Sequence, residues 1–497
     1  MTNGIFRGIL LSLCAFSFDA LLRAQTTGPG TSVSSGTQTG GTSSGASAQM
    51  TAVPQAGDQS FEGSVPQGTA SATPVPLSLG DAINRGLKAN LGLLTSEQSS
   101  REVRAERIRA LAGLLPKING QLSATEQQLN LQAIGFLFSI PGIHLPSVVG
   151  PYNYESALVN ASIPILDFNA IYNYRASRES QRASALSIKN ARDLVVLAVG
   201  DAYLQIIADA ARITAAQAEI DADNAVYTNA VRRHDAGTAI GIDVLRSQVE
   251  LKQRQQALVA VSNQFEKDKL SLGRIIGLPP GQDFTVSDPS PSVPLEAMSL
   301  QDALAKAYAN RPDYQAAKAQ MLAARFTLSA ARAERYPSAT VTGFYGAEGL
   351  GLFSNSHGVF NATGSINIPI YQGGEIRADI LRSEAELKNR SNEFENLRGQ
   401  IDSDVRNALL DLKSSGIQVD VARSNVDLAA QTLKQAQDRF GAGVTNTVEV
   451  VQAQQTVADA NENLISAQFQ YNIAKVSLAR ALGLADETIR TYFNQHP

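Results

Sequence analysis

The chain has 497 residues, 43% of them hydrophobic and 18% charged, so it can bury a core and has room for roughly two or three ordinary domains. Its net charge of −4 lacks the basic footprint of a nucleic-acid-binding protein. One cysteine leaves no intrachain disulfide, and the four histidines are scattered, with no Cys or acidic cluster to complete a metal site. We therefore expect no nucleic-acid partner, no metal and no cofactor.

The first 24 residues have the layout of a secretory signal peptide. Arg7 supplies a positive charge, residues 9–22 are mostly apolar, and Ala24 is a small residue at the expected cleavage point. The apolar run is shorter than the roughly 20 residues that a membrane span needs. Cys14 raises a second interpretation, lipidation of a processed N-terminus, but Leu13 stands where a lipoprotein signal has a small residue. Residues 1–24 are thus predicted to direct export.

Residues 25–76 form a leader rich in Gly, Ser, Thr, Ala, Gln and Pro. It contains no Lys or Arg, and its acids are Asp58 and Glu62. Such a segment buries too little apolar surface to offset the entropy of the chain. A flexible, disordered leader is therefore expected.

The rest of the chain contains the same pattern twice. Leu79-Gly80-Asp81-Ala82-Ile83 returns as Leu300-Gln301-Asp302-Ala303-Leu304, and Arg233-His234-Asp235-Ala236-Gly237 returns as Arg439-Phe440-Gly441-Ala442-Gly443. A repeat of this length indicates two copies of one structural unit. The predicted copies are residues 77–278 and 298–484, with a proline-rich linker at 279–297 and a tail at 485–497.

Both copies predict the same order of elements. A short and a medium helix run to Pro116 or Pro337, and two strands follow. Then come a helix of about 65 residues, which is roughly 100 Å long, a glycine turn, and a returning helix of about 35 residues. Residues 129–150 of the first copy are expected to form a surface loop.

The predicted strands alternate between apolar and polar side chains. A half-buried sheet of a soluble protein shows this pattern. In an exported chain, a polar face of amides and hydroxyls also fits the lumen wall of a membrane β-barrel. Four strands cannot close a barrel and lipid tolerates no open sheet edge, so a membrane location would require several chains to share one barrel. In residues 117–125, Ile118, Gly120, Leu122 and Ala124 share one face, and Asn119, Gln121, Ser123 and Thr125 share the other.

The returning helix of the second copy has heptad spacing, with large residues alternating with Ala along one stripe. The first copy repeats this stripe more loosely. A second apolar stripe lies beside the first, so the helix can contact two neighbours, as a ring of helices requires. An ordinary long antiparallel bundle is the alternative. The first stripe is Val450, Ala453, Val457, Ala460, Leu464, Ala467, Tyr471, Ala474, Leu478 and Ala481, and the second is Ile465, Phe469, Ile473 and Val476.

Taken in order, these features resemble the TolC-type outer-membrane efflux proteins, the outer membrane factors of tripartite efflux and type I secretion systems. The resemblance spans residues 77–484 and rests on the paired openings at Leu79 and Leu300, the prolines before the strands, the Ala-Gly turns and the Leu-Gly-Leu-like endings. It implies an α+β, mostly helical fold with a long antiparallel coiled-coil α-barrel. It also implies a homotrimer, in which four strands from each chain close a twelve-stranded transmembrane β-barrel.

The resemblance further implies partners and site residues. The barrel would contact outer-membrane lipid, the helical tunnel would lie in the periplasm, and the turns would meet a periplasmic adaptor protein and, through it, an inner-membrane pump. A plain turn is the alternative for these residues. The docking turns would be Ala236, Gly237, Thr238, Ala442, Gly443 and Val444. A periplasmic gate would be formed by Asp243 and Glu449, with Gln452 where an acid is also common and Arg246 nearby, placed to pair with an acid from a neighbouring chain.

The sequence contains no catalytic constellation. It has no Ser-His-Asp or Cys-His set, and residues 346–351 match a dinucleotide fingerprint only superficially, because they open no helix and are expected to form a loop at a strand end. We therefore expect no enzyme, but an exit duct that passively conducts substrates across the outer membrane. The alternative is a non-conducting periplasmic coiled-coil scaffold or an adhesive structural protein.

Overall fold

A computed structural model describes residues 61–133, 135, 146–238, 240–287, 298–351, 355–442, 444–445 and 447–485. The predicted signal peptide, residues 25–60 of the leader, most of the loop before residue 146 and nearly all of the tail lie outside this part of the chain.

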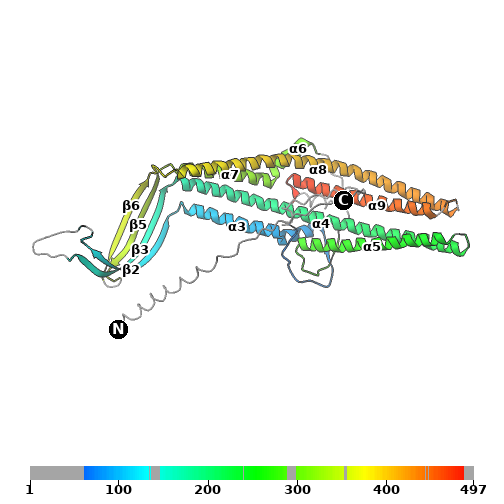
Figure 1. Cartoon of the computed structure of the whole chain (residues 1–497), viewed down its shortest axis with the longest axis horizontal. Helices are drawn as coiled ribbons and strands as arrows, with labels where there is room; N and C mark the ends of the chain where they lie inside the picture. Colours follow the sequence, from blue (N-terminus) through cyan, green and yellow to red (C-terminus); the bar gives the residue numbers. More distant parts are fainter. Residues whose placement is uncertain are drawn as a thin grey trace, which may run out of the picture. The chain divides into compact units, whose positions relative to one another are not determined.

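The order of helices and strands is the same in both halves of the chain (Figure 1). The long helices have 68 and 67 residues and the returning helices have 35 each, which confirms the predicted order and lengths. The first half contains α2 (Leu79–Ala89), α3 (Leu91–Ala112), β2 (Lys117–Asn130), β3 (Val148–Leu166), α4 (Phe168–Asp235) and α5 (Gly241–Ile275). The second contains α6 (Leu300–Asn310), α7 (Pro312–Ala333), β5 (Ser338–Gly349), β6 (Ser356–Asn367), α8 (Glu375–Gly441) and α9 (Thr447–Ala481).

Local sequence signals fix where the helices begin. Ser78 caps α2 by accepting a hydrogen bond from the Asp81 N–H, and Ser299 caps α6 in the same way through Asp302. At the joint between strand and helix, the Asp167 side chain caps α4. Ser78 and Ser299 occupy equivalent positions in the two copies, and their matching caps support the interpretation of the sequence as a duplication.

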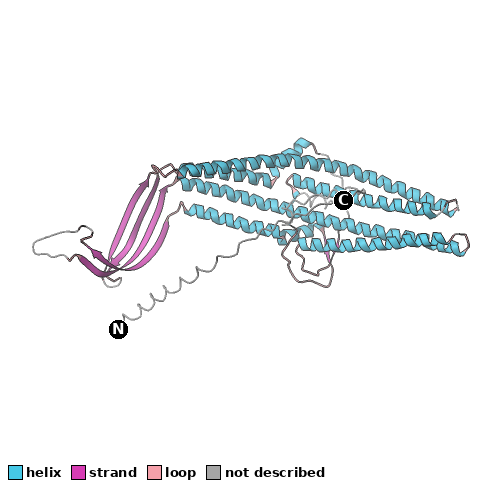
Figure 2. Ribbon diagram, viewed as in Figure 1, coloured by secondary structure: helices cyan, strands magenta, loops and turns pink. Residues whose placement is uncertain are grey.

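The four longer strands form one antiparallel sheet in the order β2-β3-β5-β6 (Figure 2). The two halves of the chain meet at the β3–β5 pair. Hydroxyl groups pair across neighbouring strands on one face, with Ser123 Oγ 2.7 Å from Ser156 Oγ and Thr340 Oγ1 3.0 Å from Ser365 Oγ. Within the described part of the chain, β2 and β6 are open edges.

The opposite face of this sheet is apolar and exposed. The register places Val159 opposite Tyr345, and Tyr345 opposite Phe360. Leu122 and Phe360 are each 79% exposed, so the rest of the described chain does not cover this face. The predicted alternation is confirmed, whereas a half-buried sheet of a soluble protein would have its apolar face covered.

The long helices pack side by side in the order α5, α4, α9, α8. α4 contacts both α5 and α9, and α9 contacts α8, whereas α5 and α9 barely touch. On the strand side of these helices, α3 and α7 pack against α4, and α7 also packs against α8 (Figure 1). The two stripes predicted on α9 therefore serve two neighbours, because its first stripe is buried or half-buried and its second joins the cluster around α4.

Two hydrophobic clusters anchor the middle of the helical region. One joins α2, α4 and the end of α5, and the Tyr203 hydroxyl within it donates to the Leu77 carbonyl at 3.0 Å. The other joins α6, α8 and α9. The first is built around Ile83, Val195, Val199, Tyr203 and Leu272, and the second around Ala303, Ile401, Val405 and Leu478.

Four expectations from the sequence need correction. The leader is not disordered up to residue 76, because β1 (Val75–Leu77) pairs in parallel with β4 (Phe284–Val286) and Val65 bonds to α2. The linker accordingly contains a strand. Both strands have three residues, too few for a periodic pattern, and they form because Leu77 and Phe284 are buried in the α4 cluster. The predicted surface loop is shorter than 129–150, because residues 129–130 belong to β2 and residues 148–150 to β3. Finally, residues 346–349 lie within β5 and not in a loop.

Candidate functional site

The first hairpin turns directly after α4 ends at Asp235. Gly237 has φ 73°, in the left-handed region that strains any residue with a side chain. The Thr238 N–H donates to the Arg233 carbonyl at 2.8 Å, which satisfies a carbonyl of the last helical turn. Ala236, Gly237 and Thr238 are all exposed, as a docking turn requires.

The second hairpin repeats this geometry. The Val444 N–H donates to the Arg439 carbonyl at 3.0 Å, which is the counterpart of the bond from Thr238 to Arg233. Ala442 is exposed and Val444 is 69% exposed. Gly443, also predicted for docking, lies outside the described residues.

The two turns of one chain are in contact with each other. The Arg233 guanidinium lies 4.4 Å from the centre of the Phe440 ring, and its Nη1 donates to the Phe440 carbonyl at 3.3 Å. Phe440 also packs with Val226 of α4 and Val450 of α9 in a small apolar cluster. These contacts hold the two tips side by side.

The predicted gate residues lie in the first turns of the returning helices. Asp243 pairs with Arg246 of its own chain at 3.7 Å, and the partner from a neighbouring chain expected for Arg246 stays a prediction. Glu449 pairs with Arg439 at 2.9 Å and accepts a hydrogen bond from the Thr445 hydroxyl. Gln452 is exposed on α9. The two carboxylates thus have separate arginine partners in the described chain, and each also suits the positive end of its helix.

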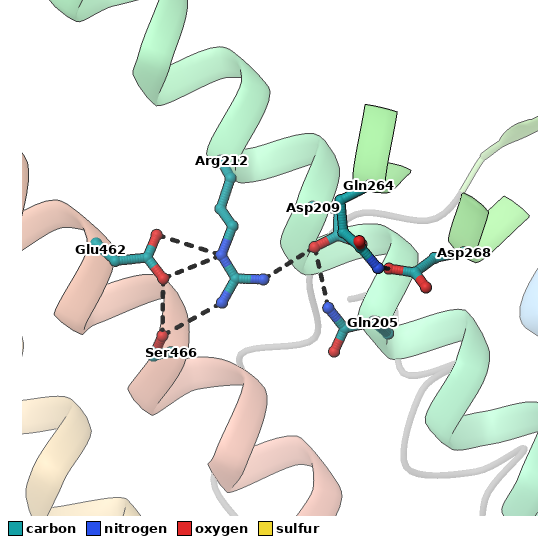
Figure 3. Close-up of polar contacts among 7 residues, drawn as sticks. All are labelled: Gln205, Asp209, Arg212, Gln264, Asp268, Glu462 and Ser466. Carbon is teal, nitrogen blue, oxygen red and sulfur yellow. Dashed lines mark hydrogen bonds and ion pairs between the residues drawn. The ribbon is translucent and has the colours of Figure 1, made fainter. Parts of the chain in front are cut away.

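A charged network that the sequence did not predict joins the two hairpins farther from the tips (Figure 3). Arg212 of α4 donates through Nε to Glu462 of α9 at 3.0 Å, and through Nη1 to Asp209 at 2.9 Å. Its Nη2 donates to Ser466 at 3.3 Å. Burial, together with the nearby Asp268 carboxylate, raises the pKa of Asp209 to about 6 against the lowering effect of Arg212.

A second network of this kind is centred on Arg254 of α5. It pairs with Glu219 at 3.2 Å and Asp223 at 3.5 Å, both on α4, and donates to Gln455 of α9 at 2.6 Å. Burial raises the pKa of Asp223 to about 6 against the lowering effect of Arg254, and Glu250 and Glu219 add to the rise. The sequence signal for the first network is Asp209 among apolar residues of α4, whereas Asp223 stands beside Asn224 and close to Asp221. The partners on α9 lie far away along the chain in both networks.

The family is decided by comparison with known proteins. A family model described as "Outer membrane efflux protein" matches residues 82–278 and 303–484. The chain belongs to the outer membrane efflux protein family. It is therefore an outer-membrane efflux channel with a helical tunnel in the periplasm, and the interpretation as a non-conducting scaffold is set aside.

Relatives of this efflux channel have closely comparable lengths. The toluene efflux pump outer membrane protein TtgF of Pseudomonas putida is 28% identical over 383 residues, which are 75% of this chain and 76% of the relative. The pyoverdine export outer membrane protein OpmQ of Pseudomonas aeruginosa is 24% identical over 412 residues, covering 82% and 85% of the two chains. Members of the family are channels and not enzymes, in line with the sequence.

Solved structures share its fold. The outer membrane protein VceC of Vibrio cholerae aligns with a TM-score of 0.71 at 18% identity, covering 82% of this chain and 96% of that one. The CmeC outer membrane channel of Campylobacter jejuni aligns with a TM-score of 0.70 at 17% identity, covering 84% and 89%. The mostly helical fold predicted from the sequence is that of these channels.

Proposed function

We propose that three copies of this efflux channel form one duct, in which their twelve strands close a β-barrel in the outer membrane and their helices continue it as a periplasmic tunnel. The observation that carries this proposal is the sheet, with its exposed apolar face and its open edges β2 and β6. Lipid solvates the apolar face but cannot satisfy open backbone edges, so β2 of one copy must pair with β6 of the next.

The helices support the same assembly. α5 and α8 flank the packed helices, and both carry large apolar side chains that no neighbour in the described chain covers. If α5 of one copy packs against α8 of the next, both rows become buried and the helical wall closes. The rows are Ile242, Leu245, Val249 and Val259 on α5, and Leu381, Ile417, Val421 and Leu428 on α8.

The turns at the far end of the hairpins form the docking rim for a periplasmic adaptor, which connects the channel to an inner-membrane pump. Their exposed backbone and small side chains allow a partner to approach closely. Ile240 and Val444 add apolar surface, since they are 66% and 69% exposed. The contact between Arg233 and Phe440 gives the rim a fixed arrangement for that partner.

Asp243 and Glu449, with Gln452 and Arg246, form the gate just inside this rim. Three copies bring six carboxylates to the tunnel mouth, where they attract cations and repel one another. The pair of Glu449 with Arg439 holds α9 against the end of α8 in the closed state. The pair of Asp243 with Arg246 lies within α5 and fixes the position of the carboxylate. Loss of these charges should therefore loosen the constriction.

The gate is tested with the channel reconstituted in planar bilayers. We expect the double variant D243N/E449Q to raise single-channel conductance several-fold and to abolish block by divalent cations. Glu393→Gln is the matched control, because Glu393 is an ion-paired glutamate in the strand-side part of α8, far along the helix from the tip. Conductance and cation block that stay unchanged in D243N/E449Q would remove the gate assignment, and a protein that forms no pores would remove the duct.

A further inference from the structure

Two buried aspartates on α4 lie between the hairpins in the same structural setting. Asp209 is 2% exposed and Asp223 is 4% exposed. They are separated by fourteen residues, or two heptads, which places them on one face of a coiled-coil helix. Beside each aspartate an arginine reaches across to α9, where Arg212 bonds to Glu462 and Arg254 bonds to Gln455. Those two partners on α9 are one heptad apart.

Around Asp209, charged and polar groups converge from three helices (Figure 3). On α4, Arg212 and Gln205 donate to its Oδ1 at 2.9 and 3.0 Å. On α5, the Asp268 carboxylate lies nearby and is itself bound by Gln264. On α9, Glu462 and Ser466 are reached through Arg212. The remaining oxygen of Asp209, Oδ2, is buried and accepts no hydrogen bond from the described residues.

Around Asp223 the arrangement is similar. Glu219 lies on its own helix, Arg254 and Glu250 approach from α5, and Gln454 approaches from α9. Asp223 Oδ2 forms an ion pair with Arg254 but no hydrogen bond among the described residues. The side-chain amide of Gln454 is also buried without a described partner, and both residues line one pocket of about 140 Å³.

A buried carboxylate oxygen without a hydrogen bond is costly, and a proton removes that cost. A protonated Asp209 can donate to Asp268, which ties α4 to α5. The positive charge of Arg212 is then balanced mainly by Glu462, which ties α4 to α9. A protonated Asp223 can donate in the same way to the Gln454 amide oxygen. Proton uptake therefore strengthens the contacts within the first hairpin and those between the hairpins.

We propose that Asp209 and Asp223 form a proton-operated latch between the two hairpins of each chain, which holds the tunnel closed in acid and releases it near neutral pH. The proposal rests on the gate proposed above, to which it adds a regulator. In this proposal, opening of the tunnel separates α4 of the first hairpin from α9 of the second and exposes both carboxyl groups to water.

The direction follows from the titration of the two groups. Burial raises the pKa of both aspartates to about 6 from the 3.8 of an exposed aspartate. The packed arrangement thus binds protons more tightly than the separated one, so it gains stability as the pH falls below 6 and loses it as the pH rises through 6. Between pH 7.5 and pH 5 each aspartate should favour the packed arrangement by up to about tenfold.

The decisive experiment measures the open probability of the assembled channel in planar bilayers between pH 5 and pH 7.5. The wild type should open at least about tenfold less often at pH 5 than at pH 7.5. The double variant D209N/D223N mimics the protonated state, because an Asn amide can donate where the carboxyl proton would, so it should stay at the low level throughout. Asp221→Asn is the control, since Asp221 is exposed on α4 between the two positions, and it should keep the wild-type profile. Asp243 and Glu449 are present in all three proteins, so their titration is common to all.

A melting experiment separates the latch from the gate. Wild-type trimers should melt at a higher temperature at pH 5 than at pH 7.5, and D209N/D223N should lose that difference. If the double variant keeps it, these aspartates are not the titrating groups and the latch is overturned. If the wild-type melting difference depends on them but opening does not change with pH, the latch does not act on the tunnel and the proposal also fails. The gate itself is tested separately, by the conductance of D243N/E449Q in planar bilayers. Should D209N/D223N not assemble, each single variant is expected to remove about tenfold of the effect.

Discussion

The two hairpins of this channel have the same lengths and the same turns, yet they bury opposite helices. In the first hairpin the outgoing helix α4 has fifteen buried residues and the returning helix α5 has four. In the second, the outgoing helix α8 has eight and the returning helix α9 has fourteen. α4 and α9 therefore form the centre of the four-helix arrangement, and α5 and α8 form its edges.

Because of this difference in burial, equivalent helices of the two copies occupy different positions in the row of four, one at its centre and the other at its edge. The central helices lie between two neighbours within the chain, so their sequences are constrained on two faces. Each edge helix has one neighbour among the four long helices, α4 for α5 and α9 for α8, and their exposed apolar rows are available to a second copy. The buried aspartates Asp209 and Asp223, and the arginines Arg212 and Arg254 that bond to α9, also lie where the two hairpins meet.

The largest effect that tests this comparison is a cavity in a central helix. Leu204 of α4 is 2% exposed, and Leu204→Ala should lower the free energy of unfolding by about 2–5 kcal/mol. Leu270 of the edge helix α5 is 73% exposed in the single chain, and only a neighbouring copy could cover it, so Leu270→Ala should lower it by about 1 kcal/mol or less. Denaturant unfolding of the purified channel measures both. Equal losses in the two variants would contradict the division into central and edge helices.

The same division explains what the sequence could predict about the helices. The stripe on α9, from Val450 to Ala481, was readable because contacts on two sides impose a strict spacing. The matching stripe on α5 was looser because most of that helix faces away from the rest of its chain. Strand alternation was readable for a different reason, since the two faces of the sheet differ in polarity and Leu122, Tyr345 and Phe360 lie on the mostly apolar one.

The remaining features depend on long-range pairing, which periodicity does not encode. Arg212 and Glu462 lie 250 residues apart, and nothing in either local sequence identifies the other. The contact between Arg233 and Phe440 likewise depends on a difference between the two copies, because Phe440 stands where the first copy has His234. The gate was predicted by resemblance alone, and the contact of Arg246 with a neighbouring chain stays a prediction, because it depends on how the copies assemble.

An intermediate effect is expected at the edges. Ile417 of α8 is 57% exposed in the single chain, and the proposed assembly buries it against a neighbouring copy. Ile417→Glu would place a charge in that contact and should destabilise the trimer by about 1–3 kcal/mol per chain. Ala430→Glu, at an exposed position on the opposite face of the same helix from Val421, is the control. The measurement is the trimer fraction by light scattering in detergent. An unchanged trimer in Ile417→Glu would mean that α8 is not the contacting edge.

The smallest effect should distinguish the two tips, because their backbones match and they differ mainly in flanking charge. Arg232 and Arg233 end α4, whereas Asp438 and Arg439 end α8. The variants Thr238→Cys and Val444→Cys, made in a Cys14→Ser background, should each crosslink to a protein of adaptor size in whole cells. The yields should differ by a few-fold as a result of the charge difference, and high salt should reduce that difference because the flanking side chains are exposed. Gln217→Cys, at an exposed position well back along α4, should give no such product. If neither tip forms the product, the rim does not dock an adaptor, and if Gln217→Cys forms it equally, the contact is not confined to the rim.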